Sequence, residues 1–138
     1  MEPLQQVAAL AYVEAPGSPL VLLITTRGRG RWTIPKGWPK ARSADAETAA
    51  REAFEEGGVG GEVSTSPVGT YDYTKRFHVF SWARCRASVY LLQVDRQFLT
   101  WPEKASRTFI WVTAARAAEM VRERQLAELL RSFAERGA

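Results

Sequence analysis

The first third of the chain has the apolar pattern of β-strands separated by turns. Residues 5–14 and 20–26 are rich in Val, Leu, Ile and Ala, and the turn-forming sequence Pro16-Gly17-Ser18-Pro19 lies between them. Two such runs joined by a short turn predict a β-hairpin. A third, short β-prone run covers residues 32–34. After it we expect three residues to prevent regular structure: Pro35, Gly37 and Pro39.

Residues 44–57 change to a helical pattern. Apolar residues recur at positions that share one face of an α-helix, namely Ala46, Ala49, Ala50, Ala53 and Phe54. Ser43 is the expected N-cap, because its hydroxyl can accept a hydrogen bond from the first turn. Gly57 and Gly58 are expected to end the helix.

The second half of the chain returns to a strand pattern and ends in helix. Residues 62–95 are rich in Val, Tyr, Phe, Thr and Trp and predict two or three strands, and residues 108–112 predict a last short strand. From Met120 to Phe133 the apolar residues keep a helical period. This order of elements is typical of an α/β fold with a mixed sheet and helices packed on it. We expect one domain over residues 1–138, because no linker or repeat divides the chain.

The composition shows an excess of positive charge and no apolar run long enough to span a membrane. The chain has 138 residues, a net charge of +4 and a pI near 9.6. Its longest apolar run, residues 19–24, is far shorter than the ~20 residues that span a bilayer. The N-terminus lacks a basic segment followed by an apolar one, so no signal peptide is expected. Cys85 is the only cysteine, and we expect a reducing, cytoplasmic location.

The excess positive charge is concentrated in one segment. Six cations fall within sixteen residues: Arg27, Arg29, Arg31, Lys36, Lys40 and Arg42. Such density can serve nucleic acid, acidic lipid or a polyanionic small molecule. Taken singly, each of these residues is equally compatible with a solvated surface.

Three glutamates share one face of the predicted helix. Glu52, Glu55 and Glu56 stand at i, i+3 and i+4, where like charges repel by roughly 0.2–0.5 kcal/mol per pair. Two of them lie in the last turn, where the helix dipole is already negative. A divalent cation would remove this repulsion, since Mg²⁺ binds carboxylate oxygens together with substrate phosphates. From these residues alone, a solvated acidic face remains the alternative.

The surrounding spacing resembles the Nudix box, whose pattern is G-x5-E-x7-R-E-U-x-E-E-x-G-U with U aliphatic. Residues 37–59 match it at Gly37, Arg51, Glu52, Ala53, Glu55, Glu56, Gly58 and Val59. One position departs, because Ser43 stands where the pattern has its first glutamate. In the family that glutamate is less central to metal binding than the later three. Its replacement leaves metal affinity and the choice of catalytic base open.

The resemblance extends beyond the box. The basic loop 27–31 and the sequence Pro35-Lys36-Gly37-Trp38-Pro39 are similar to a Nudix subgroup of diphosphoinositol polyphosphate and diadenosine polyphosphate hydrolases. Residues 101–104 and 107–111 resemble the loop and strand that complete the site in several Nudix enzymes. Some of those enzymes use a glutamate of this loop as a metal ligand or base, and Glu103 is the matching residue.

This resemblance implies a Nudix α/β/α sandwich and a hydrolase that cleaves a phosphoanhydride bond with Mg²⁺, or with Mn²⁺ as a substitute. The implied metal ligands are Glu52, Glu55, Glu56 and a backbone carbonyl near Lys36 or Gly37. The general base is left open among three carboxylates: Glu55, Glu56 and Glu103. Arg51 is expected to hold a box glutamate in place, and the six clustered cations are expected to bind phosphate oxygens. A homodimer is common in the family.

Two alternatives stay open. A Nudix-fold domain can sense a nucleotide without turnover, and Ser43 permits this, although the three intact helix glutamates argue against it. A nucleic-acid-binding protein would explain the pI, but no zinc-ligand spacing, helix-turn-helix pattern or aromatic RNA-binding signature accompanies the charge. We therefore expect a small, anionic, phosphorylated substrate. The density of Arg and Lys favours a dinucleoside polyphosphate or an inositol pyrophosphate over a sugar nucleotide.

Overall fold

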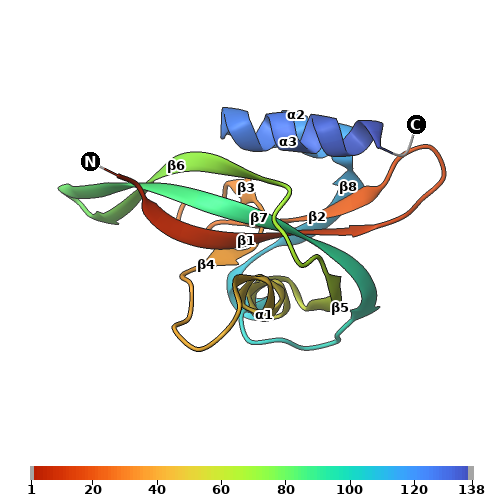
Figure 1. The fold of residues 1–138 in the computed structure, drawn as a ribbon, viewed down its shortest axis with the longest axis horizontal. Coiled ribbons are helices and arrows are strands. Elements are labelled where there is room, and N and C mark those ends of the chain that lie inside the picture. Colours follow the sequence, from red (N-terminus) through yellow and green to blue (C-terminus); the bar gives the residue numbers. More distant parts are fainter. Residues whose placement is uncertain (1, 137–138) are drawn as a thin grey trace.

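The computed structural model describes residues 2–136, which form a curved mixed sheet with helices on both faces (Figure 1). The strands are β1 (Leu4–Val13), β2 (Leu20–Thr25), β3 (Trp32–Thr33), β4 (Lys36–Gly37), β5 (Val59–Val63), β6 (Gly69–His78), β7 (Ser81–Gln97) and β8 (Phe109–Thr113). The helices are α1 (Asp45–Gly57), the short 3-10 helix η1 (Lys104–Ser106), α2 (Ala114–Met120) and α3 (Arg124–Glu135).

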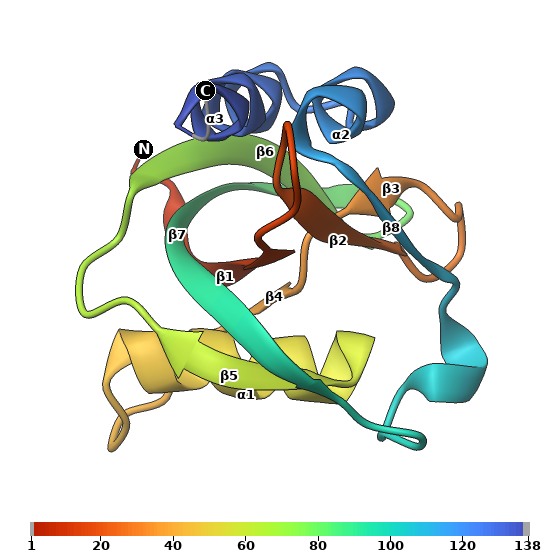
Figure 2. The same cartoon turned by 90° about the vertical axis from the view of Figure 1, so that its right-hand side faces the viewer.

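β1 lies at the centre of the sheet. β7 runs parallel to it from the Leu4–Cys85 pair to the Tyr12–Gln93 pair, and β2 runs antiparallel to it through Tyr12–Val21. β3 and β8 pair with β2, while β5 and β6 pair with successive parts of β7. Figure 2 shows β7 curving from the α1 side to the side of α2 and α3, which lets it pair with β5 at one end and β6 at the other.

The two faces of the sheet carry separate hydrophobic cores. Alternate residues of β1 point to opposite faces. Val7 and Ala9 belong to the core packed against α1, and Ala8 and Leu10 belong to the core under α2 and α3. A strand covered on both faces needs a continuous apolar run, which is the pattern of residues 5–14.

Helix α1 begins one residue later than its sequence suggests. The N-cap is Ala44, which makes no side-chain cap hydrogen bond, so the expected cap at Ser43 is wrong. The C-terminal stop is confirmed: Gly58 has a φ of 70°, and its N–H donates to the carbonyl of Phe54 at 3.0 Å. No basic residue lies in the last turn, and the negative end of the helix therefore gains no compensating charge from its own side chains.

The β1–β2 hairpin and the last strand are confirmed, and two expectations are corrected. Pro35, Gly37 and Pro39 do not prevent pairing, because β4 pairs with β1 through Gly37–Val7. The tail forms two helices rather than one continuous helical segment, because the backbone is extended at the buried Val121 between them. Neither glycine nor proline marks this break in the sequence. No helix within residues 2–136 has the length and apolar character needed to cross a bilayer.

Candidate active site

Gly37 in β4 faces Glu52 on α1. A Cβ atom at position 37 would lie 2.6 and 2.7 Å from the two carboxylate oxygens of Glu52, closer than real Cβ atoms come to their neighbours. Glycine therefore leaves the room that this carboxyl group occupies. Pairing of Gly37 with Val7 holds β4 against β1, so the sheet fixes where the box loop meets the helix.

Glu52 and Glu56 form a carboxyl pair one helical turn apart. Glu56 is buried and Glu52 is partly buried. Burial raises the pKa of Glu52. Burial, and then a hydrogen bond donated to Glu52, raises the pKa of Glu56 to about 8. Two carboxyl groups that share a proton at neutral pH are in the state expected before a cation takes the proton's place.

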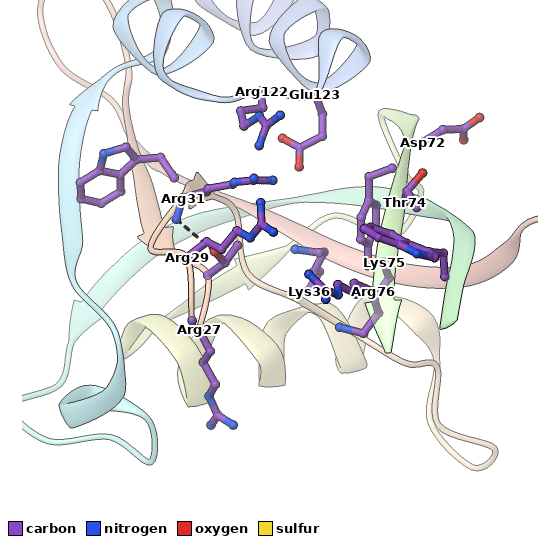
Figure 3. Close-up of a pocket in the computed structure, with 15 residues that line it drawn as sticks. Arg27, Arg29, Arg31, Lys36, Asp72, Thr74, Lys75, Arg76, Arg122 and Glu123 are labelled. Atoms are coloured by element: carbon purple, nitrogen blue, oxygen red, sulfur yellow. Dashed lines mark hydrogen bonds between the residues drawn. The ribbon is translucent and has the colours of Figure 1, made fainter. Parts of the chain in front are cut away.

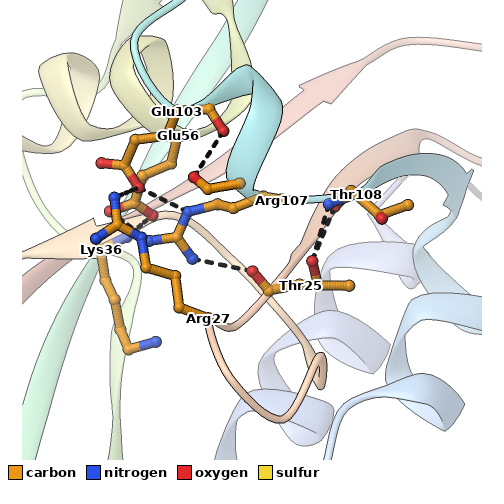
Figure 4. Close-up of polar contacts among 8 residues, drawn as sticks. Thr25, Arg27, Lys36, Glu56, Glu103, Arg107 and Thr108 are labelled. Atoms are coloured by element: carbon orange, nitrogen blue, oxygen red, sulfur yellow. Dashed lines mark hydrogen bonds and ion pairs between the residues drawn. The ribbon is translucent and has the colours of Figure 1, made fainter.

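Two groups from outside the helix hold the carboxyl group of Glu56. The backbone N–H of Lys36 donates to its Oε1 at 3.2 Å, and Nη2 of Arg107 lies 3.9 Å from its Oε2 (Figure 4). The ammonium of Lys36 lies 4.9 Å from the centroid of the Tyr73 ring, and burial lowers the pKa of this lysine. Glu56 is thus fixed by both the box loop and a distant part of the chain.

The segment between β7 and β8 is docked on the C-terminal end of α1. The ring of Trp101 covers Gly58, where a Cβ atom would lie 2.7 Å from Cζ3 of the indole. The N–H of Glu103 donates to the carbonyl of Glu55 at 2.9 Å, which satisfies one of the free acceptors at the helix end. Gly58 therefore both ends the helix and admits Trp101, and this docking brings Glu103 to the helix glutamates.

Arg107 connects three elements of the fold. Its Nε donates to Oε1 of Glu103 at 2.9 Å, and its Nη1 donates to the carbonyl of Thr25 at 2.9 Å. Its Nη2 faces Glu56. A second arginine, Arg27 in the loop after β2, brings its Nη2 within 2.9 Å of the same Oε1 of Glu103. Glu103 therefore lies between two arginines that come from different segments.

Three predicted residues lie outside this network. Arg51 is exposed and forms no ion pair within residues 2–136, so the structure shows no contact by which it would hold a box glutamate. An exposed pair of this kind would gain little in water. Lys40 is close enough to Glu52 for its charge to oppose the rise in that residue's pKa, and Arg42 is exposed in the loop before α1.

Two of the three helix glutamates expected to bind metal form a pair in this structure, and the expectation for Glu55 stays a prediction. In the described part of the chain, no three acidic, histidine or cysteine side chains converge on one point. Glu52 and Glu56 do come together, and the partly buried Glu55 lies near enough for its charge to add to the rise in the pKa of Glu52. When the shared proton is lost, the two carboxylates offer the oxygen donors that Mg²⁺ accepts while it keeps several waters.

A cavity of about 650 Å³ opens next to these residues and is strongly cationic. Its charged lining consists of seven cations and two carboxylates: Arg27, Arg29, Arg31, Lys36, Lys75, Arg76, Arg122, Asp72 and Glu123. Figure 3 shows that they project from the loop after β2, from β4, from β6 and from the segment between α2 and α3. Lys40 and Arg42 do not line it.

Little of this positive charge is neutralised within the protein. Asp72 already receives two hydrogen bonds from Arg86, at 2.7 and 3.0 Å. Partial desolvation, and then the charges of Arg122 and Arg29, lower the pKa of Arg31. Cations that repel one another in this way mark a place where an anion binds favourably.

Sequence reasoning assigned no role to several residues that the fold brings to this place. Arg107 had a local signal, because it follows Glu103 at the i+4 spacing of an ion pair. Lys75, Arg76 and Arg122 had none, since they join the 27–31 loop only through the pairing of β6 with β7 and the packing of α2 and α3.

Known proteins resemble this chain in both sequence and fold. The family model described as NUDIX domain matches residues 4–133. Mitochondrial Nudix hydrolase 16 of Arabidopsis thaliana is 34% identical over 105 residues, which are 74% of this chain and 58% of that protein. This chain therefore belongs to the Nudix family. It spans only 56–63% of the length of the curated relatives that it matches.

Solved structures share the fold at low sequence identity. The Ap4A hydrolase of C. elegans has a TM-score of 0.66 and 17% identity, with 96% of each chain covered. The NUDIX domain of Shewanella oneidensis NrtR, solved with ADP ribose, has a TM-score of 0.66 and 20% identity over 96% of this chain and 88% of that chain. The expected α/β fold with a mixed sheet is confirmed.

Proposed function

We propose that this chain hydrolyses a phosphoanhydride bond of a small polyphosphorylated molecule in an Mg²⁺-dependent reaction. The observation that carries the proposal is a buried carboxyl pair, Glu52 and Glu56, next to a cavity lined by seven cations. Lys36 and Arg27 belong to both places, because they line the cavity while they contact Glu56 and Glu103 respectively. A phosphate chain held in the cavity therefore reaches the carboxylates.

The parts of the site have different tasks in this reaction. When held by Glu52 and Glu56, the ion would supply charge neutralisation for the phosphates and acidification of water. Guanidinium groups in the cavity hold the phosphates that do not react, since their paired N–H groups match phosphate oxygens. Arg107 keeps Glu56 and Glu103 in a fixed relationship.

Glu103 is the carboxylate that we propose as the proton acceptor. Both carboxyl oxygens of Glu56 already have partners in Lys36 and Arg107, and in this proposal Glu56 would also hold the ion. Glu103 receives its arginines on Oε1, and no residue of 2–136 donates a hydrogen bond to its Oε2. An oxygen without a donor is available to take a proton from attacking water.

The cavity lining favours a substrate with more phosphates than the pair that is cleaved. Seven cations against two carboxylates leave an excess of charge that one diphosphate does not balance. We therefore place dinucleoside polyphosphates and inositol pyrophosphates ahead of sugar nucleotides. One structural neighbour is described as an Ap4A hydrolase and another as complexed with ADP ribose, and both compounds contain phosphoanhydride bonds.

A second candidate is a domain that binds its ligand without turnover. It is favoured by the lack of a third converging carboxylate within residues 2–136 and by Ser43 in place of the box glutamate. Such a domain would use the same cationic cavity and leave the phosphoanhydride bond intact.

One assay separates the two candidates. Purified protein is incubated with diadenosine polyphosphates, an inositol pyrophosphate, ADP-ribose and nucleoside triphosphates, with Mg²⁺ and then with EDTA. We expect Mg²⁺-dependent product from the first two groups, no product in EDTA, and none from Glu56→Gln. Glu119→Gln, which removes an exposed glutamate of α2, is the control and should match the wild type. Saturable binding without product would favour the second candidate.

A further inference from the structure

One carboxylate oxygen of Glu103 contacts two arginines whose side chains differ greatly in exposure to solvent. Nε of Arg107 and Nη2 of Arg27 each lie 2.9 Å from its Oε1. The side chain of Arg107 is 14% exposed and is also held by the carbonyl of Thr25, whereas that of Arg27 is 63% exposed. Within residues 2–136, Glu103 is the only carboxylate that pairs with Arg27. One contact is therefore made by a mostly buried side chain that is also held elsewhere, and the other by a side chain exposed to solvent (Figure 4).

The backbone around Arg27 is fixed, so a change of partner involves only its side chain. The N–H of Thr26 donates to the carbonyl of Arg31 at 2.7 Å, and the N–H of Arg31 donates back to the Thr26 hydroxyl at 3.0 Å. Between them, Gly28 and Gly30 take the positive φ values of 83° and 64° that close the loop. Arg27 lines the cationic cavity from this closed loop.

We propose that Arg27 is exchanged between Glu103 and the substrate. In the anion-free protein Arg27 pairs with Glu103, and a phosphate that enters the cavity takes Arg27 from it. Glu103 is then held by Arg107 alone, which leaves its carboxylate in place with one fewer donor. This proposal rests on the proposed function, because it assumes that the ligand of the cavity is phosphorylated.

The physical basis is competition between two anions for one guanidinium. A polyphosphate chain carries more charge in total than one carboxylate and offers several oxygens to the paired N–H groups of arginine. An exposed ion pair such as Arg27–Glu103 shifts an equilibrium by no more than about fivefold, so a bound phosphate outcompetes it. This competition is reciprocal: a bound anion weakens the contact between Glu103 and Arg27, and Glu103 weakens the binding of the anion by the same factor.

This reciprocity makes the exchange measurable without turnover. Binding of inorganic tripolyphosphate is titrated calorimetrically in EDTA, so that no metal contributes. Glu103→Gln keeps the shape of the side chain and removes its charge, and we expect it to tighten binding by about two- to fivefold. In the Arg27→Met background, Glu103→Gln should have no effect on binding, because Glu103 no longer competes with the anion for the Arg27 guanidinium.

Matched variants exclude a general effect of charge. Glu55→Gln removes a carboxylate from the neighbouring end of α1, and Glu119→Gln removes one of an exposed ion pair on α2. Neither should tighten binding as Glu103→Gln does. An equal gain in Glu55→Gln, or a gain from Glu103→Gln that persists in Arg27→Met, would overturn the exchange, as would unchanged or weaker binding in Glu103→Gln. Thermal melts of each variant confirm that it is folded.

The two proposals fail in different ways. A wild-type protein that turns over none of the candidate substrates would refute the hydrolase, while a binding cycle that behaves as expected in EDTA would still establish the exchange. Conversely, Mg²⁺-dependent turnover together with additive effects of Glu103→Gln and Arg27→Met on tripolyphosphate binding would leave the hydrolase intact and refute the exchange.

Discussion

Gly37 and Glu52 meet so closely across the boundary between β4 and α1 that no side chain fits at position 37. A Cβ atom there would lie 2.6 Å from Oε1 of Glu52. The obstacle is the end of a flexible side chain rather than backbone, so a larger residue would displace Glu52 and leave the fold in place. Position 37 thus controls the carboxyl pair without belonging to the helix that carries it.

We predict that Gly37→Ala lowers kcat/KM by about a hundredfold, the loss expected when a reacting group is misplaced by about 1 Å, with little change in Tm. Steady-state kinetics and thermal melts test both parts. Gly60→Ala is the control, because its Cβ would lie 3.3 Å from a flexible arginine, Arg96. Wild-type kinetics in Gly37→Ala would show that Glu52 need not occupy this place.

The carboxyl pair also makes the metal-free protein sensitive to pH. The pKa of Glu56 is raised to about 8 from an ordinary value of 4.5. Below the ordinary value both folded and unfolded chains are protonated, and between the two values the unfolded chain alone releases the proton. This contribution to stability is therefore lost as pH rises from about 5 through about 8.

We accordingly predict that the Tm in EDTA falls across this pH range in the wild type and falls less in Glu56→Gln. Neutralisation should also raise the Tm of the variant above that of the wild type at pH 8, and added Mg²⁺ should narrow the gap. Thermal melts at several pH values provide the measurement. Parallel curves for the two proteins would mean that Glu56 does not hold the raised pKa.

The local elements of the fold could be predicted from the sequence because their signals are local. The helix over residues 44–57 has its apolar stripe, its glycine stop and its glutamates within a few turns of each other. The break at Val121 has no such signal, since that residue fits the helical period on either side of it. Its extended backbone is set by burial between α2 and α3, which is a property of the packed protein.

Arg107 should matter for turnover more than for substrate binding. We predict that Arg107→Met lowers kcat strongly with a smaller change in KM, because Glu56 and Glu103 lose their common donor. It should also destabilise the protein by about 1–3 kcal/mol, the cost of a buried acceptor left without a partner. Arg107→Lys should recover part of kcat. Kinetics and urea denaturation test this, and a variant that alters only KM would contradict it.

Arg122 should have the opposite kinetic signature. It lines the cavity from the segment between α2 and α3 and has no contact with Glu52 or Glu56 among the ion pairs of residues 2–136, and contacts made equally in the ground and transition states affect KM alone. We predict that Arg122→Ala raises KM by about tenfold for a polyphosphorylated substrate and leaves kcat unchanged. Arg124→Ala is the control, because Arg124 is exposed, pairs with Glu128 and does not line the cavity. Equal effects in the two variants would indicate only a loss of net charge.

The composition of the site was predictable in part, for the same reason as the fold. Glu52 and Glu56 could be assigned because one helix turn relates them. Arg51 could not be judged from its spacing, since an i+4 neighbour is equally free to point into solvent, where it lies. The role of Arg122 could not be predicted, because it depends on which strand and which helices pack next to the 27–31 loop. Residues that are brought together by tertiary packing have no periodic pattern in the sequence.

The parallel pairing of β1 with β7 has a consequence for synthesis of the protein. Leu4 has no partner on β7 until Cys85 has left the ribosome, and Tyr12, which pairs with Val21 on its other side, has no partner on β7 until Gln93 has done so. Helix α1 is made before the strand that completes the sheet beneath it, and Glu103 and Arg107 are made later still. Pairings over such long separations close slowly. The nascent chain thus carries its three helix glutamates through the synthesis of the next 51 residues, from Glu56 to Arg107, before the last of the surrounding charged groups is made.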